Sequence, residues 1–249
     1  MLRFFRQLRK TLLENGNLRK YFWYALGEIL LVMIGILLAL QVNNWNEDRK
    51  KELFEIGMLQ ELVVASERDS ALVTDFFNPR IEIKESAIDS FLIAINSEVN
   101  LNEARLAELY NSLNVEFLFR FNAGPYETIK SNGLDIISNE VLRASISGMY
   151  ETTLPAFKGF ITITYEELKP VIQDLEPEFL INRIEWHNGE WHNHRYSKDG
   201  RMLQNEAFIR VLGYQVDIAR NYRDRISTIQ GYTLELRNAI RAELAKRGS

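Results

Sequence analysis

An unbroken apolar run near the start of the chain constrains its fold more than any other feature. Residues 21–42, YFWYALGEILLVMIGILLALQV, contain a single charged side chain, Glu28. A helix of this length, at ~1.5 Å per residue, crosses the ~30 Å hydrocarbon core of a bilayer. Aromatic side chains, which gather at membrane–water interfaces, occupy residues 21–24 and Trp45. The sequence therefore predicts one transmembrane helix over residues 21–45.

The charges beside this run predict its orientation. Residues 1–20 carry six basic side chains and one acidic side chain, Glu14, whereas residues 47–52 are balanced. Because basic flanks stay on the cytoplasmic side, we expect a cytoplasmic N-terminus, a single pass through the inner membrane, and about 200 residues in the periplasm. The apolar run exceeds the ~7–15 residues of a cleaved signal peptide and no A-x-A site follows it, so we interpret it as an uncleaved signal-anchor.

The first 20 residues have the pattern of a helix that lies on a membrane surface. Apolar side chains recur at Leu2, Phe5 and Leu8, three residues apart, and basic side chains occupy the other faces. This arrangement suits contact with anionic lipids of the inner leaflet. The alternative is that the charges only set the topology. The basic residues are Arg3, Arg6, Arg9, Lys10, Arg19 and Lys20.

One face of the predicted membrane helix carries a carboxylate and two small residues. Helical steps of four and three define this small-residue face, which comprises Glu28, Val32, Gly35 and Ala39. Gly35 and Ala39 form a small-xxx-small pair, which lets two helices approach closely. A carboxylate inside a bilayer faces a partner, snorkels to the headgroups, or lines an ion or proton path. We predict a homo-oligomer through this face, with snorkelling and conduction as the alternative roles of Glu28.

The rest of the chain predicts a mostly α-helical fold, in which the transmembrane helix continues into an extracytoplasmic helical bundle. We expect the first helix to end at Pro79, because proline cannot continue a helix. The three predicted parts are the basic amphipathic helix 1–20, the transmembrane helix 21–45 and the helical domain 46–249. Further helices are expected over residues 81–95, 101–113, 125–133, 139–150 and 155–175, with an extended segment over 115–121.

The last helix has the clearest periodicity. It is expected from Asn205 to Arg247, a length of about 60 Å. Apolar residues recur every three or four positions between Leu212 and Ile240, which is the spacing of a helix–helix seam. Gln215 interrupts the apolar seam. This interruption suits packing against other helices of the same domain at least as well as a free coiled coil.

Two stretches of the sequence resemble a known family. The first is YALGEILLVMIGILLALQVNNWNEDRK, a glycine–glutamate span that follows a basic segment and closes with N-N-W-N. The second is YETIKSNGLDIISNEVLRASISGMY, residues 126–150. Together they are similar to an uncharacterised family of single-pass membrane proteins known mainly from Bacteroidota, built on a domain of unknown function. The resemblance implies location and architecture, assigns no chemistry, and does not extend to residues 176–204.

All three histidines occur in one segment, WHNGEWHNHRY, residues 186–196. Imidazole and carboxylate groups are common ligands of divalent metals, so the segment is a candidate for a metal site in a strand or a tight loop. Interleaved aromatic side chains suit an exposed loop that contacts a protein partner. We interpret the segment as such a loop and predict neither a metal nor a cofactor. The candidate ligands are His187, His192 and His194, with Glu185 and Glu190 nearby.

Composition and motifs remove several classes of function. The chain has no cysteine, which excludes disulfides, iron–sulfur clusters, zinc fingers and thiol nucleophiles. Its net charge of −4 argues against a nucleic-acid partner. No GxSxG, HExxH or P-loop motif occurs, so no catalytic residue is predicted.

We therefore expect a non-catalytic, membrane-anchored protein of the bacterial cell envelope that associates with itself and acts as a scaffold, interaction or sensor protein. Its expected partners are the lipid bilayer, a second copy of the chain and an envelope protein. The first alternative is an oligomeric pore or ion pathway, which Glu28 favours but the absence of a continuous polar stripe opposes. The second is a metal-dependent envelope enzyme, for which the histidine segment is the only support.

Overall fold

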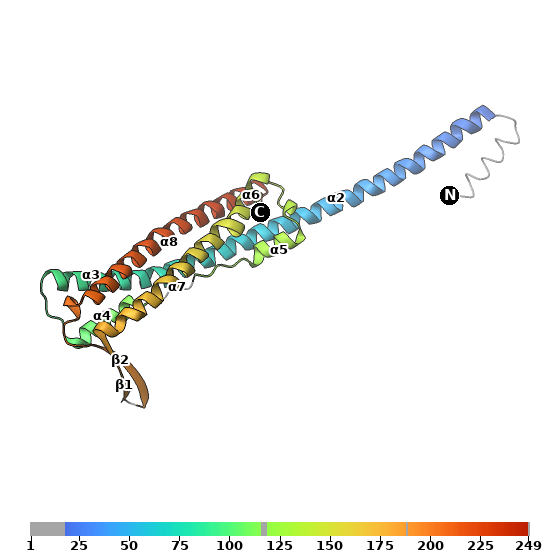
Figure 1. The fold of residues 1–249 in the computed structure, drawn as a ribbon. Helices are drawn as coiled ribbons and strands as arrows, with labels where there is room; N and C mark the ends of the chain where they lie inside the picture. Colours follow the sequence, from blue (N-terminus) through green and yellow to red (C-terminus); the bar gives the residue numbers. More distant parts are fainter. Residues whose placement is uncertain (1–17, 116–118, 188, 249) are drawn as a thin grey trace. The chain divides into compact units, whose positions relative to one another are not determined.

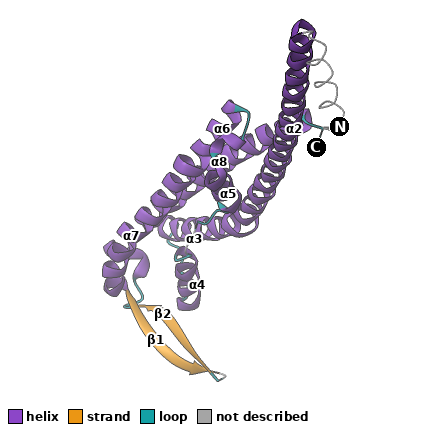
Figure 2. Ribbon diagram, turned by 90° about the vertical axis from the view of Figure 1, so that its right-hand side faces the viewer, coloured by secondary structure: helices purple, strands orange, loops and turns teal. Residues whose placement is uncertain are grey.

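The structure consists of helices and one small β-hairpin (Figure 1; Figure 2). This computed structural model describes residues 18–115, 119–187 and 189–248, with all their side chains except those of residues 18, 20, 21, 24, 187 and 192. The chain divides into two compact units, Met1–Glu55 and Ile56–Ser249. The prediction of a mostly α-helical fold is confirmed. The predicted surface helix falls outside the described residues except for its last three positions.

The first described element is α2 (Leu18–Leu72), which contains the predicted membrane span. Its most apolar window has a mean hydropathy of 2.4, and none of that window is buried within the chain. Large apolar side chains such as Leu31 and Leu38 are exposed in the isolated chain. By length and composition, α2 is therefore able to cross a membrane. The expected continuation of the helix beyond Trp45 is confirmed.

Pro79 does not end the helical path, so that prediction is wrong. A π-helical turn, η1 (Val73–Phe77), follows α2 directly, and α3 (Asn78–Asn96) begins immediately after it. Pro79 lies in the first turn of α3. A proline is tolerated there because the first N–H groups of a helix have no acceptor within it. The regular α-helix is interrupted instead at η1, where backbone hydrogen bonds join residues five positions apart rather than the four of an α-helix.

Side-chain caps set the beginnings of several later helices. The side chain of Asn102 accepts a hydrogen bond from the Arg105 amide (2.8 Å), and that of Asn205 accepts one from the Ala207 amide (2.9 Å). Gly133, with φ of 100°, caps the C-terminal end of its helix as expected. The helices are α4 (Glu103–Leu113), α5 (Gly124–Asn132), α6 (Glu140–Ser147), α7 (Leu154–Phe179) and α8 (Glu206–Lys246), with short helical turns η2 (Leu134–Ile136), η3 (Gly148–Thr153) and η4 (Met202–Gln204).

The core of the second unit lies along α8, which runs beside α7 (Figure 1). Most positions of the predicted seam are buried, among them Gln215, Tyr222 and Ile226. Near the start of α8, the ring of Phe208 packs edge-on against Phe91 of α3 (5.0 Å between centroids) and Phe179 of α7 (5.4 Å). The seam therefore packs against helices of the same domain, in agreement with its interrupted apolar pattern.

A β-hairpin occupies the segment that was expected to be a loop. Strands β1 (Leu180–His187) and β2 (Glu190–Ser197) pair antiparallel, with Trp186 opposite Trp191. The loop prediction is wrong: apolar and polar residues alternate over residues 183–187 and 190–192, on both sides of the turn, and this pattern favours a strand. The hairpin is tied to the helices at its base, where the Ser197 amide donates to Glu103 Oε2 of α4 (2.9 Å).

Candidate functional site: a lysine-containing cavity

A cavity of about 210 Å³ lies inside the second unit. Its lining comes from α3, α4, α7, α8 and the hairpin strand β2, so it forms only when the whole domain is folded. Leu168, Ile172 and Ile218 give it apolar walls, and ionisable side chains lie among them. A cavity of roughly 150 Å³ with apolar walls holds benzene, so this one has room for a slightly larger molecule.

Lys84 is the deeply buried basic group of the cavity, with only 3% of its surface exposed. It lies on the inner face of α3, one helical turn from Ile81 and Ile88, which are both buried. Its Nζ donates to the carbonyl of Leu113 and to Oε1 of Gln215. Leu113 is the last residue of α4, so no N–H group of that helix donates a hydrogen bond to its carbonyl. Lys84 thereby joins α3 to the end of α4 and to α8.

The surroundings of Lys84 make its charge costly. Both acceptors of its ammonium group, a backbone carbonyl and an amide, are neutral. Burial lowers the pKa of Lys84 from its ordinary value to about 7. Near neutral pH the amine is therefore close to the midpoint between its charged and neutral forms. The neutral amine can accept a proton. Once charged, the ammonium group meets no negative charge at either of these two acceptors.

A second polar group of the cavity centres on Glu176 of α7. Arg195 of β2 lies 3.7 Å from its carboxylate, and the Tyr110 hydroxyl donates to the same oxygen at 2.7 Å. Burial, followed by the negative charge of Glu176, raises the pKa of Tyr110 above its ordinary value. Tyr110 therefore remains a proton donor at physiological pH. This carboxylate, the one acidic group among the described residues of the lining, is thus already held by a cation and a hydroxyl.

A third polar group consists of Lys169 and Tyr165, one turn apart on α7. Lys169 Nζ donates to the Tyr165 hydroxyl and lies 4.6 Å from the centre of its ring. Both side chains are partly exposed. Among the described residues, the lining holds three basic side chains, Lys84, Lys169 and Arg195, and one acidic side chain, Glu176. The cavity therefore combines apolar walls with an excess of positive charge.

The small-residue face predicted from the sequence lies on α2. Val32 is 55% exposed, and Ala39 is also exposed in the isolated chain. Apart from Gly35 itself, its two chain neighbours and the adjoining backbone of its own helix, no described atom lies within 4 Å of the place that a Cβ would occupy at Gly35. Glu28 is only partly exposed. The described chain itself therefore leaves the space beside Gly35 open, and its proposed occupation by a second copy stays a prediction.

The predicted basic surface is described only at its end. Arg19 is exposed on α2, and Lys20 belongs to the same helix, although its side chain is not described. The four remaining basic residues lie outside the described residues. Contact with anionic lipids therefore stays a prediction. These four are Arg3, Arg6, Arg9 and Lys10.

The strand register places the three histidines on the same face of the hairpin. His192 pairs with Glu185, His194 with Arg183, and His187 with Glu190. Alternate residues of a strand share a face, so the strand geometry that a metal site demands is present. No cluster of three potential ligands occurs among the side chains that the structure describes. The side chains of His187 and His192 are not among these, and the expectation of no metal stays a prediction.

Sequence reasoning missed the cavity, although two signals pointed toward it. Lys84 interrupts the apolar face formed by Ile81, Ile88 and Phe91, and Gln215 interrupts the apolar seam of α8. Each polar residue alone suggests a local irregularity. Only their contact, across 131 residues of sequence, defines a site.

These features define a class of protein: a helical domain with a buried lysine in a cavity, on a chain that also carries an apolar helix long enough to span a membrane. The chain belongs to a family of unknown function (DUF6090), whose model matches residues 28–159. The match includes Lys84, whereas Arg195 and Gln215 lie outside it. No curated protein and no solved structure matches the chain.

Proposed function

We propose that this protein is a membrane-anchored, self-associating sensor of the bacterial cell envelope, whose helical domain binds a small molecule in the cavity. The cavity of about 210 Å³ is the observation that carries the proposal. A buried ionisable lysine inside a domain costs stability and is a common feature of binding sites. The proposal includes no catalytic step.

The anchor in this proposal is the apolar part of α2. Basic residues precede it, which supports a cytoplasmic N-terminus and a periplasmic domain. The resemblance to a Bacteroidota family supports the same location. Self-association is supported by Gly35 and Ala39, since small residues let two helices approach within a bilayer.

Self-association can be tested in native membranes with single cysteines. The natural chain contains none, so every disulfide dimer must form through the introduced residue. Ala39→Cys should give dimers on mild oxidation, and Gly35→Leu in the same chain should reduce them. Leu37→Cys is the matched control, because it lies about 200° around the helix from Gly35. Equal dimer yields from the cysteines at positions 37 and 39 would refute association through the small-residue face.

The sensor role can be tested with a library of small molecules. Ligand-observed NMR would compare the full-length protein in lipid nanodiscs with a variant whose cavity is filled by Leu168→Trp. Leu168 lines the cavity, so molecules that bind in the cavity of the natural protein should give no binding signal with the variant. If every binder of the natural protein also binds the filled variant, the cavity is not the ligand site and the sensor proposal fails.

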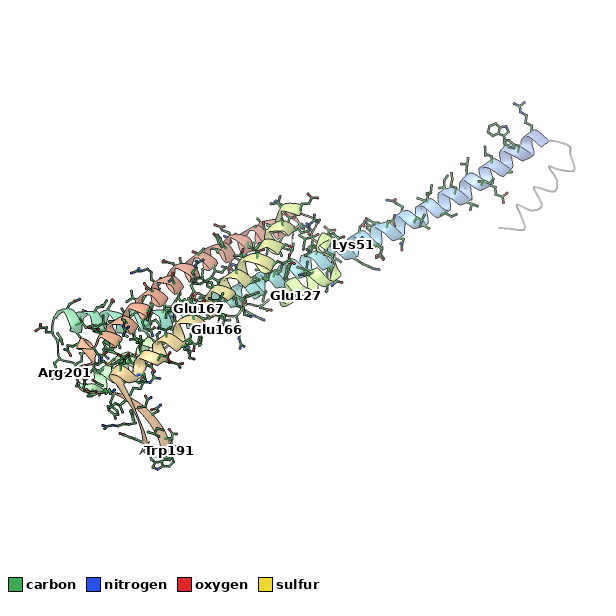
Figure 3. All side chains as sticks on the ribbon, viewed as in Figure 1. Lys51, Glu127, Glu166, Glu167, Trp191 and Arg201 are labelled. Carbon is green, nitrogen blue, oxygen red and sulfur yellow. The ribbon has the colours of Figure 1, made fainter. Side chains whose placement is uncertain are left out.

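The hairpin favours a second candidate, an interaction protein. Trp186 and Trp191 are 58% and 70% exposed, and their rings meet edge-on with centroids 4.8 Å apart. Figure 3 shows Trp191 at the end of the hairpin, away from the helices. Exposed tryptophans are favourable anchors in protein interfaces. Crosslinking in native membranes, compared between the natural protein and Trp191→Ala, tests this role; an unchanged pattern of partners would contradict it.

A further inference from the structure

We infer that the ligand of the cavity is a small organic carboxylate with an apolar body, and that the charged Lys84 side chain holds its carboxylate. This inference rests on the proposed sensor function and specifies the chemical class of its ligand. It follows from three properties of the cavity: its charge, its walls and its size.

The charge of the lining favours an anion. Among the lining residues that the structure describes, Lys84, Lys169 and Arg195 face one carboxylate, Glu176, which already accepts from Tyr110 and lies beside Arg195. The two acceptors of Lys84 are neutral. A buried ammonium group is strongly stabilised by a negative partner with direct hydrogen bonds. A ligand carboxylate would supply that partner.

The walls favour an organic anion over an inorganic one. Leu168, Ile172 and Ile218 contribute apolar surface beside the charged groups. A free phosphate would leave this surface in contact with water, whereas a hydrocarbon body would cover it. The volume of about 210 Å³ exceeds the roughly 150 Å³ that holds benzene. It therefore suits one ring, or an alkyl chain of similar size, that carries one carboxylate.

Binding should be coupled to protonation of Lys84. Within the part of the lining that the structure describes, the other titratable or charged groups are Tyr165, Lys169 and Glu176 of α7, Arg195 of β2 and Tyr222 of α8, and α4 contributes none. Burial raises the pKa of Tyr222 to about 12, so it keeps its proton. Burial lowers the pKa of Lys84 to about 7, and a bound carboxylate would raise it again. Above this pH, ligand binding should therefore take up a proton.

Calorimetric titration of the full-length protein in lipid nanodiscs tests the inference, with empty nanodiscs as the blank. The probes are benzoate and benzamide, which have nearly the same shape but differ in charge. We expect benzoate to bind and benzamide to bind roughly 10- to 100-fold more weakly, as for the loss of a charged hydrogen bond. At about pH 8, titrations in two buffers of different ionisation enthalpy should show uptake of roughly one proton per benzoate. Between about pH 6 and pH 8, the apparent affinity should fall about tenfold.

Two variants test whether benzoate binding and proton uptake depend on Lys84. Lys84→Met should weaken benzoate binding roughly 10- to 100-fold and abolish the proton uptake. The matched control is Lys158→Met, which removes an exposed lysine of α7 that does not line the cavity, and it should leave binding unchanged. If Lys84→Met does not fold, the proton uptake of the natural protein and the loss of benzoate binding in Leu168→Trp still decide the question.

The outcomes separate this inference from the sensor proposal. Equal binding of benzamide and benzoate, or binding without proton uptake, would overturn the carboxylate assignment. So would a library screen whose cavity-dependent binders carry no carboxylate. In each of these cases the cavity could still be a sensor site. If no molecule depends on the open cavity, both proposals fail together.

Discussion

Replacement of Lys84 by methionine should change how the stability of the domain depends on pH. Burial lowers the pKa of Lys84 from 10.5 to about 7 in the folded protein. Between these two values the unfolded chain binds more protons than the folded chain, so the free energy of unfolding increases as the pH rises. As the pH falls through about 7, Lys84 becomes protonated in the folded state too, and below this range its contribution is constant.

The size of this change in stability with pH follows from the lowered pKa of Lys84. Each pKa unit corresponds to about 1.4 kcal/mol, so the charged form of Lys84 costs the folded state roughly 5 kcal/mol. Between about pH 7 and pH 9, the natural protein should gain roughly 2 kcal/mol of stability from this group. Lys84→Met has no such group and should lack this gain. The variant also leaves the Leu113 carbonyl and Gln215 without a donor, so the slope is more informative than the stability at one pH.

Urea unfolding of the full-length protein in nonionic detergent, followed by the helical circular dichroism signal, measures this slope. Lys158→Met is again the control and should behave as the natural protein does. The series should stop near pH 9, because the buried tyrosines with raised pKa values would add an opposite slope at higher pH. Parallel slopes for the natural protein and Lys84→Met would refute the account of a lysine whose pKa is lowered by burial.

Three other predictions concern different parts of the chain. A C-terminal alkaline phosphatase fusion should be active, and a C-terminal fluorescent protein exported in the unfolded state should be dark; the reverse pattern would place the domain in the cytoplasm. Asn205→Ala removes the cap of α8 and should lower the free energy of unfolding by about 1 kcal/mol in the same urea assay, whereas no change would mean that the cap contributes little. Protein purified without a histidine tag should contain no stoichiometric zinc by elemental analysis. One zinc per chain, lost when His192 and His194 are both changed to alanine, would contradict this prediction.

The helices were predictable where local chemistry determines them. Asn205 and the periodic apolar positions defined α8 almost to the residue, and Gly133 correctly marked the end of α5. The end of α2 was not predictable from Pro79, because a proline is equally compatible with the first turn of a new helix. The hairpin was not predicted because its second strand, EWHNHRYS, contains four consecutive polar residues, which weaken the alternation typical of a strand.

The cavity could not be predicted from local sequence patterns. Lys84 and Gln215 come from helices far apart in sequence, and Arg195 comes from a strand that was expected to be a loop. The polar interruption of each helix is visible in the sequence, but a polar residue at a buried position has several explanations. Their convergence depends on how α3, α7 and α8 pack, which single-sequence periodicity does not determine.

The position of α8 in the chain has a consequence for biosynthesis. Its buried residues complete the packing of helices made much earlier, and Arg241 near its end pairs with Glu67 of α2, 174 residues away. Contacts of such long sequence separation form only after the intervening chain is available. Until α8 is synthesised and, under the proposed topology, exported, apolar faces of α3 and α7 remain uncovered. The domain must therefore complete its core late, during an interval in which the partly made chain is prone to aggregation and would benefit from a chaperone.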